Sequence, residues 1–328
     1  MDLSTLVKMS NTYGSNPAYV LAGGGNTSVK NDTTLYVKGS GTQLATIKAE
    51  GFVKMDRARL NEIMKTEYPK NDVEREAAYL ADVMAAVTDD DKTKRPSVEA
   101  LLHNLFAYTY VLHVHPTLVN GLTCGKGAQA LCEELLGEAV LWIDICKPGY
   151  TLARLCFEKM NAYKEKYGKD VQVLLLQNHG IFVAANTVEE IGVLFDGVIS
   201  KLEKQVRRTA DVSNAITPEK EQTAQKLSQL LGHAVEVVPV AEADNFAKDK
   251  TAAAPLLKPF TPDHIVYCGP YPLFVENIDQ AKEALDAFMT ENDKEPRLIL
   301  VQGIGAFIME DDKEKAAKAQ LLVKDAIK

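Results

Sequence analysis

The chain has 328 residues, 46% of them hydrophobic and 25% charged, which is the composition of a globular protein with one large or two smaller domains. Its formal charge of −8 and pI near 5.4 exclude the basic surface that binds nucleic acid or an acidic membrane. Segment 1–9 lacks the features of a signal peptide, no apolar run is long enough to span a bilayer, and the five cysteines are scattered. We therefore expect a cytoplasmic protein with reduced thiols.

Helices and strands alternate along the first part of the chain. A short helix is expected at 2–14, and a glycine turn at 23–25 leads into a strand that is followed by a second strand at 34–38. The spacing then predicts helices at 56–65, at 73–87 and from Ser97 to Leu105; Ser97 is the expected N-cap of the last, with Glu99 in its first turn. Further strands are predicted at 110–115, 140–144, 171–176 and 180–184, and further helices at 152–167 and 187–210. This alternation predicts an α/β protein.

The pattern breaks near residue 215, and we predict a first domain at 1–215 and a smaller α/β domain at 216–328. The second domain should contain a helix at 217–231, a strand at 235–240, and a linker at 248–258.

The second domain also resembles part of the first. Segment 298–308 aligns with 173–183, and segment 264–270 aligns with 110–116. In this alignment Tyr267, Gly269 and Ile304 take the places of three histidines of the first domain. Either the chain contains a degenerate repeat, or similar strand–turn–strand–helix units recur by chance.

Those histidines are the main chemical feature of the sequence. His113 and His115 are two residues apart in a predicted strand, so both side chains point to one face about 7 Å apart. His179 follows a later predicted strand. Three imidazoles with an open fourth position make a catalytic zinc site, although a His-x-His pair alone is more often two ordinary strand residues.

The chain resembles the class II aldolase/adducin family in the segments Gly24-Gly-Asn-Thr-Ser28, Lys38-Gly-Ser-Gly41, Pro96-Ser-Val-Glu99 with His103, His113-Val-His115 and Asn178-His179-Gly180. They occur in the family's order and extend over roughly residues 15–210. Within the family, the chain is similar to the aldolase part of bifunctional rhamnulose-phosphate aldolase/dehydrogenase chains. No Gly-x-Gly-x-x-Gly follows a strand, so we expect no nicotinamide cofactor.

The resemblance implies a three-layer αβα fold with a central mixed sheet, to which the smaller C-terminal α/β unit is added. It also implies that His113, His115 and His179 bind zinc or another divalent transition metal, and that Glu99 is the general acid/base. The alternative for Glu99 is a helix-start carboxylate, and His103 is expected to pack or to support the site rather than to bind metal.

A phosphate site is implied at Asn26, Ser40, Gly41 and Ser97, and Lys38 would add charge. Glycine turns expose N–H donors, and a serine at a helix start adds a hydroxyl, but the same glycines also suit plain hairpin turns. Val98 departs from the family, whose aldolases often have a second serine there, and this puts the phosphate in doubt.

The implied activity is a zinc-dependent, reversible cleavage of a ketose phosphate, such as rhamnulose or fuculose phosphate, to dihydroxyacetone phosphate and a short aldehyde through an enediolate. The second acid/base is often a tyrosine of a neighbouring subunit in such families, so we expect a homo-oligomer such as a tetramer. A sugar-phosphate 4-epimerase of the same fold and a non-catalytic adducin-like interaction protein are the alternatives. Proteins of the last kind tend to lack the three histidines.

Overall fold

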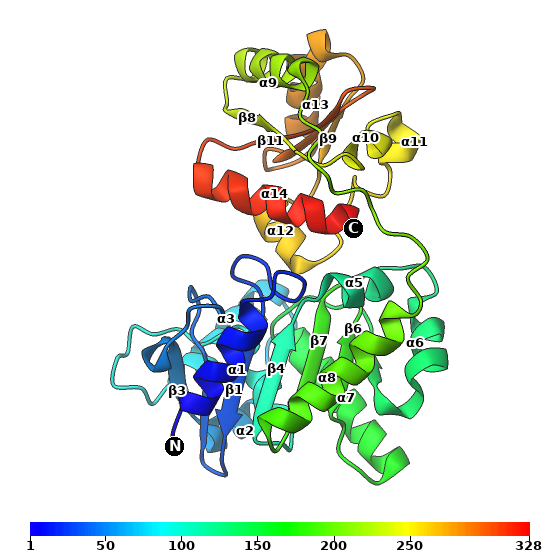
Figure 1. Ribbon diagram of the computed structural model, residues 1–328. Helices are drawn as coiled ribbons and strands as arrows, with labels where there is room; N and C mark the ends of the chain where they lie inside the picture. The colour runs from blue at the N-terminus through cyan, green and yellow to red at the C-terminus, as the bar shows by residue number, and fades with distance from the viewer. The chain divides into compact units, whose positions relative to one another are not determined.

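The computed structural model describes residues 1–328 and divides into two compact units, Met1–Gln205 (unit 1) and Val206–Lys328 (unit 2) (Figure 1). Both units contain a sheet with helices, as the alternating pattern predicts. No helix is both long and apolar enough to cross a membrane.

Unit 1 is built on a seven-stranded mixed sheet. Its strands are β1 Asn26–Lys30, β2 Thr34–Lys38, β3 Phe52–Asp56, β4 Tyr110–Val114, β5 Leu141–Ile143, β6 Val173–Leu176 and β7 Gly180–Ala185. Their order in the sheet is β3-β2-β1-β4-β7-β6-β5. All neighbours are antiparallel except β5 and β6, which are parallel.

Helices cover both faces of this sheet. The helices of unit 1 are α1 Ser4–Gly14, α2 Arg57–Ile63, α3 Asp72–Ala85, α4 Ala100–Leu105, α5 Thr117–Thr123, α6 Ala128–Leu136, α7 Tyr150–Tyr167 and α8 Val188–Glu203. Leu112 and Val114 of β4 pack with α1, α5, α6 and α8, whereas Val111 and its neighbour Phe182 pack with α4 and α7. Figure 1 shows α1 and α8 crossing one face of the strands. The three-layer αβα fold with a mixed central sheet is thereby confirmed.

Alternation along β4 decides where the histidines point. Since Leu112 and Val114 face α1 and α8, His113 and the following His115 face the α4 side of the sheet. On the neighbouring strand, Asn26 pairs with His113 and therefore lies on the same face.

Helix α4 begins later than its sequence predicts. Ser97 is not its N-cap; Glu99 occupies that position and makes no side-chain cap hydrogen bond, while Ser97 Oγ accepts from the Glu99 backbone N–H at 3.3 Å. The Glu99 side chain is buried, so the carboxylate belongs to the interior rather than to a solvated first turn.

Unit 2 contains a four-stranded sheet of order β8-β11-β10-β9. The elements of this unit are α9 Pro218–Leu231, β8 Val235–Val237, α10 Ala243–Phe246, α11 Lys250–Ala253, α12 Pro262–Cys268, β9 Leu273–Val275, α13 Ala281–Glu291, β10 Leu298–Val301, β11 Gly305–Met309 and α14 Lys313–Ile327. Helices α9 and α13 contribute apolar side chains to one core with β9, β10 and β11, and α14 contacts β11 and α12.

The predicted linker at 248–258 is wrong. Asp249 caps α11 through the backbone N–H of Ala252, and Ala253 and Leu256 are buried, so the segment packs as part of unit 2. Alanine and proline content is typical of linkers, but here the alanines form a helical turn.

The four-stranded sheet of unit 2 repeats the arrangement of four of the seven strands of unit 1. In both sheets the strand order and directions are the same when β8, β9, β10 and β11 are matched with β4, β5, β6 and β7. Ile304 is the third residue after β10, as His179 is the third residue after β6. Each is preceded by a residue with positive φ, Gly303 at 74° and Asn178 at 55°.

The second alignment, of segment 264–270 with segment 110–116, is nevertheless wrong. Segment 264–270 forms α12 and the turn after it, so Tyr267 and Gly269 do not stand where His113 and His115 stand. In unit 1 His113 pairs with Phe182 of β7, and in unit 2 Val237 pairs with Phe307 of β11. Val237 therefore occupies the position that corresponds to His113. Thr261 and Pro262 favour a helix here, because proline fits the first position of a helix but cannot donate a hydrogen bond within a sheet.

Candidate metal centre

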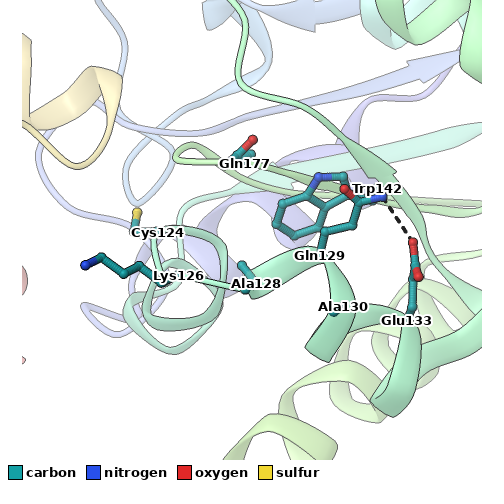
Figure 2. Close-up of a pocket in the computed structure, with 10 residues that line it drawn as sticks. Cys124, Lys126, Ala128, Gln129, Ala130, Glu133, Trp142 and Gln177 are labelled. Carbon is teal, nitrogen blue, oxygen red and sulfur yellow. Dashed lines mark hydrogen bonds between the residues drawn. The ribbon is translucent and has the colours of Figure 1, made fainter.

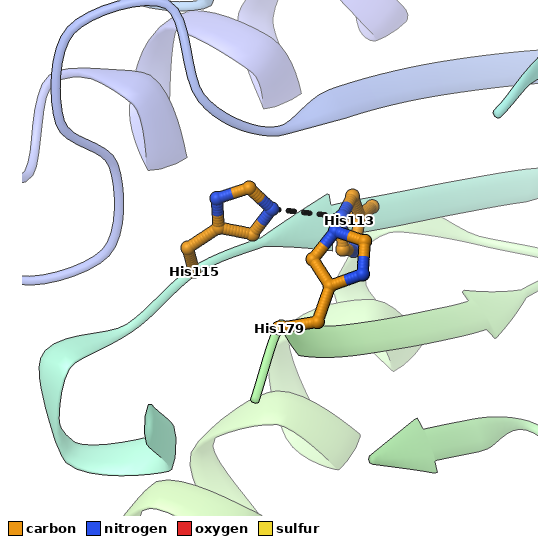
Figure 3. Close-up of side chains that lie close together, drawn as sticks. All are labelled: His113, His115 and His179. Atoms are coloured by element: carbon orange, nitrogen blue, oxygen red, sulfur yellow. Dashed lines mark hydrogen bonds between the residues drawn. The ribbon is translucent and has the colours of Figure 1, made fainter. Parts of the chain in front are cut away.

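The structure brings His113, His115 and His179 together although they come from two segments far apart in the sequence. Their candidate ligand nitrogens all lie within 4.8 Å of one another, and the Nε2 atoms of His113 and His115 are 2.9 Å apart. Figure 3 shows the three rings converging, two from the end of β4 and one from the turn before β7. This donor set matches a three-histidine metal site with an open position.

The surroundings of His113 suit a metal ligand. Its Nδ1 lies 2.9 Å from the Ile181 carbonyl oxygen, which can only accept, so Nδ1 carries the hydrogen and Nε2 keeps its lone pair. The ring stacks on Phe182 with a centroid distance of 3.9 Å. Burial, followed by the neighbouring His115 and His179, holds the pKa of His113 well below its ordinary value and favours the neutral, metal-binding form.

Gly180 lets the backbone pass close to these rings. A Cβ atom at this position would lie 2.6 Å from the Val114 carbonyl oxygen and 2.8 Å from His115 Cδ2. Any side chain there must displace β4 or the imidazole.

We therefore expect Gly180→Ala to destabilise the protein by about 1–3 kcal/mol and to weaken metal binding. Gly197→Ala is the matched control, because Gly197 lies inside α8 with nothing within 4 Å of its added Cβ; it should be neutral or stabilising by up to about 1 kcal/mol. Urea denaturation and metal analysis measure both. Equal stability of the two variants would contradict the close approach.

Glu99 lies beside the imidazoles. Its Oε2 is 3.3 Å from His113 Nε2, and its Oε1 is 3.4 Å from His179 Nε2. The side chain is 6% exposed. A carboxylate at this distance from the open side of a metal site can move protons to and from a bound substrate.

Three of the four predicted phosphate residues come from adjoining backbone segments. The Ser40 N–H donates to the Arg95 carbonyl at 2.8 Å, the Ser97 N–H donates to the Lys38 carbonyl at 2.9 Å, and Gly41 follows Ser40 with φ of 83°. Lys38 Nζ donates to the Gly23 carbonyl at 3.2 Å and so joins this turn to the glycine segment.

The fourth, Asn26, is oriented differently from what a simple phosphate donor needs. Its Nδ2 donates to Glu99 Oε2 at 2.8 Å and its Oδ1 contacts His103 Nε2. His103 is fully buried and does not lie among the histidines of the metal cluster. The alternation of polar residues 26, 28 and 30 indicates that these side chains share one face of a strand, but it does not identify the residues that they contact.

A separate cleft of about 610 Å³ opens between the start of α6 and β5. Figure 2 shows Cys124 and Lys126 on the loop before α6, and Trp142 and Gln177 on the strand side. Neither Glu99 nor the three histidines line it, so the candidate metal centre is a different site.

Comparison with known proteins agrees with this architecture. Residues 5–196 match the class II aldolase and adducin N-terminal domain. The uncharacterized oxidoreductase YuxG of Bacillus subtilis (strain 168) is 24% identical over 92% of this chain, and the chain spans about half (50%) of that relative's length.

Solved structures of class II aldolases are also similar to this chain. The N-terminal class II aldolase domain of a conserved protein from Thermoplasma acidophilum is 27% identical, with a TM-score of 0.53 over 63% of this chain and 94% of that one. The L-fuculose-1-phosphate aldolase of Thermus thermophilus is 16% identical, with a TM-score of 0.39 over 62% and 95% of the two chains. By the match over residues 5–196, the chain belongs to the class II aldolase and adducin family.

Proposed function

We propose that the protein is a metal-dependent aldolase that cleaves a ketose phosphate into dihydroxyacetone phosphate and a short aldehyde. The observation that carries this proposal is the Glu99 carboxylate, buried and within 3.4 Å of His113 and His179 Nε2. A base beside a three-imidazole donor set suits proton transfer at a carbon next to a carbonyl.

His113, His115 and His179 would hold the metal, zinc or another divalent transition ion, through their Nε2 atoms. When bound, such an ion supplies Lewis-acid stabilisation of the negative charge that develops on the substrate's oxygens. The neutral form of buried His113 and the hydrogen bond of its Nδ1 to Ile181 support this assignment.

Glu99 would hold or release the proton at the carbon that becomes nucleophilic. Asn26 donates a hydrogen bond to Glu99 Oε2, the carboxylate oxygen that lies 3.3 Å from His113 Nε2, and so helps to hold this carboxylate beside the imidazoles. The site is largely closed to solvent around His113, and this limits quenching of a carbanion-like species by water.

For the substrate's phosphate we propose Ser40, Gly41 and Ser97, together with the second hydrogen of Asn26 Nδ2. The hydroxyls of Ser40 and Ser97 and the N–H of Gly41 are donors of the kind that bind phosphate at short range, and the overall charge of −8 is screened beyond about 8 Å. Val98, 64% exposed, stands where the family often has a further serine and contributes no donor.

Ser97→Ala should raise KM for a phosphorylated ketose about tenfold, since a hydrogen bond to a charged group contributes about 1.5–3 kcal/mol. Val98→Ala, one residue away and without a donor, should leave KM unchanged. Steady-state kinetics and a crystal soaked with phosphoglycolate measure the two effects. Phosphoglycolate bound away from Ser97, or equal KM for both variants, would favour an unphosphorylated substrate.

The proposed reaction is tested by incubating the metal-loaded protein with a panel of ketose 1-phosphates and analysing the products. Dihydroxyacetone phosphate with an aldehyde supports the aldolase, a single isomeric sugar phosphate identifies a 4-epimerase, and no turnover of any ketose phosphate overturns the proposal. We also propose a cytoplasmic homo-oligomer, such as a tetramer, whose subunit number light scattering measures directly.

A further inference from the structure

A row of buried polar side chains extends from Glu99 away from the histidines. Asn26, Ser28 and Lys30 alternate along β1 and face α4, where Glu99 and His103 stand one helical turn apart. All five are at most 7% exposed. Polar groups this deeply buried need hydrogen-bond partners, so the contacts within the row define its structure.

The contacts form one continuous chain. Ser28 Oγ lies 2.7 Å from His103 Nδ1, His103 Nε2 contacts Asn26 Oδ1, and Asn26 Nδ2 donates to Glu99 Oε2 at 2.8 Å. Behind this chain, Lys30 Nζ donates to the His103 backbone carbonyl at 2.9 Å.

The chemistry of the groups fixes the direction of every hydrogen bond. The Asn26 amide turns its nitrogen to Glu99 Oε2, to which it donates, and its oxygen to His103 Nε2. The amide oxygen only accepts, so His103 Nε2 must carry the ring hydrogen. Burial, followed by the charge of Lys30, lowers the pKa of His103 well below its ordinary value, so its ring is neutral. Nδ1 is then an acceptor for the Ser28 hydroxyl.

We propose that His103 is a positioning residue, which orients Asn26 so that Asn26 holds the Glu99 carboxylate against His113 and His179. The inference rests on the proposed role of Glu99 as the base of the reaction. The chain does not conduct protons, because an amide cannot accept a proton at its oxygen and release one from its nitrogen on each turnover. Its effect is geometric: Glu99 can rotate away from His113 Nε2 only if Asn26 loses its acceptor.

The tautomer of His103 tests this arrangement without any activity. In protein labelled with ¹⁵N at histidine, and assigned by comparison with His103→Gln, the His103 ring should give the signals of a neutral Nε2–H imidazole between pH 6 and 8. A neutral Nδ1–H ring would make Nε2 an acceptor, reverse the hydrogen bond to Asn26 and overturn the inference, whereas a ring that carries a hydrogen on Nε2 supports it.

Variants then test the effect on Glu99. His103→Leu should lower kcat by roughly ten-fold to a hundred-fold, with metal content within about twofold of the parent, because misplacement of a reacting group by about 1 Å costs this much. His103→Gln should recover most of kcat, since its Nε2 can still donate to Asn26. Asn104→Ala is the matched control: Asn104 is buried on the same helix, but its hydrogen bonds go to Arg57 and Asn61.

Equal kcat for His103→Leu and the parent, or no difference between the Leu and Gln variants, would overturn the positioning role. Should the parent cleave no ketose phosphate, the proposed function fails, and the crystal structure of His103→Leu decides the inference separately. Loss of the Glu99–His113 contact, 3.3 Å in the parent, supports it, and an unchanged contact contradicts it.

Discussion

Glu99→Gln is expected to lower turnover by at least about 10²-fold while the metal stays bound. Glutamine keeps the size of the side chain and its place at the start of α4, but it cannot accept a proton as a carboxylate does. Its amide oxygen can still accept the hydrogen bond from Asn26 Nδ2, whereas its amide nitrogen cannot.

The measurement is steady-state kcat of the metal-loaded protein, with metal content determined on the same sample. Glu138→Gln is the control, because Glu138 is an exposed carboxylate paired with Lys169 and should have no effect on kcat. Near-normal turnover of the Glu99 variant would return this residue to the alternative role of a helix-start carboxylate.

His179→Ala is expected to lower metal affinity by more than about 10–100-fold. Removing a residue that only hydrogen-bonds to a metal ligand costs this much, and removing the ligand itself should cost more. The fold should persist, because His179 lies in the turn between β6 and β7, whose ladder runs from Val173 paired with Val183 to Leu176 paired with Gly180. Turnover should fall with metal content and should not recover at moderate excess of zinc.

The control is His233→Ala, which removes a histidine of unit 2 that is paired with Asp311 and Glu295. It should retain the metal content and turnover of the parent. Full metal occupancy in His179→Ala, measured by elemental analysis after gel filtration, would remove His179 from the proposed ligand set.

Local patterns in the sequence predicted most of the fold. Short apolar runs predicted β4 and β7, and the capping box beginning at Thr187 predicted the start of α8, where Thr187 Oγ1 accepts from the Glu190 N–H. The failures were at positions where two local signals compete. Ser97 and Glu99 can each begin a helix, and only the burial of the Glu99 carboxylate decides between them.

The second failure, α12, has the same cause. An apolar segment of seven residues fits either a strand or a helix, and the packing of His264 against the Leu322 carbonyl of α14 is long-range information that spacing does not contain.

The candidate site was predictable only in part, for a similar reason. His113 and His115 share a face by the periodicity of a single strand, so their convergence follows from local sequence. The contact of Asn26 with His103 joins residues 77 positions apart, and it depends on the pairing of β1 with β4 and on the approach of α4 to that face. Neither follows from spacing, so the role of Asn26 in holding Glu99 could not be derived from the sequence.

Anomalous scattering tests most directly whether His113, His115 and His179 form a metal site. Crystals of the protein grown with zinc should be measured on both sides of the zinc absorption edge. We predict one strong anomalous peak about 2.0–2.1 Å from Nε2 of His113, His115 and His179. A strong peak at His233 and Asp311 with none among the three histidines, or no peak in zinc-saturated crystals, would contradict it.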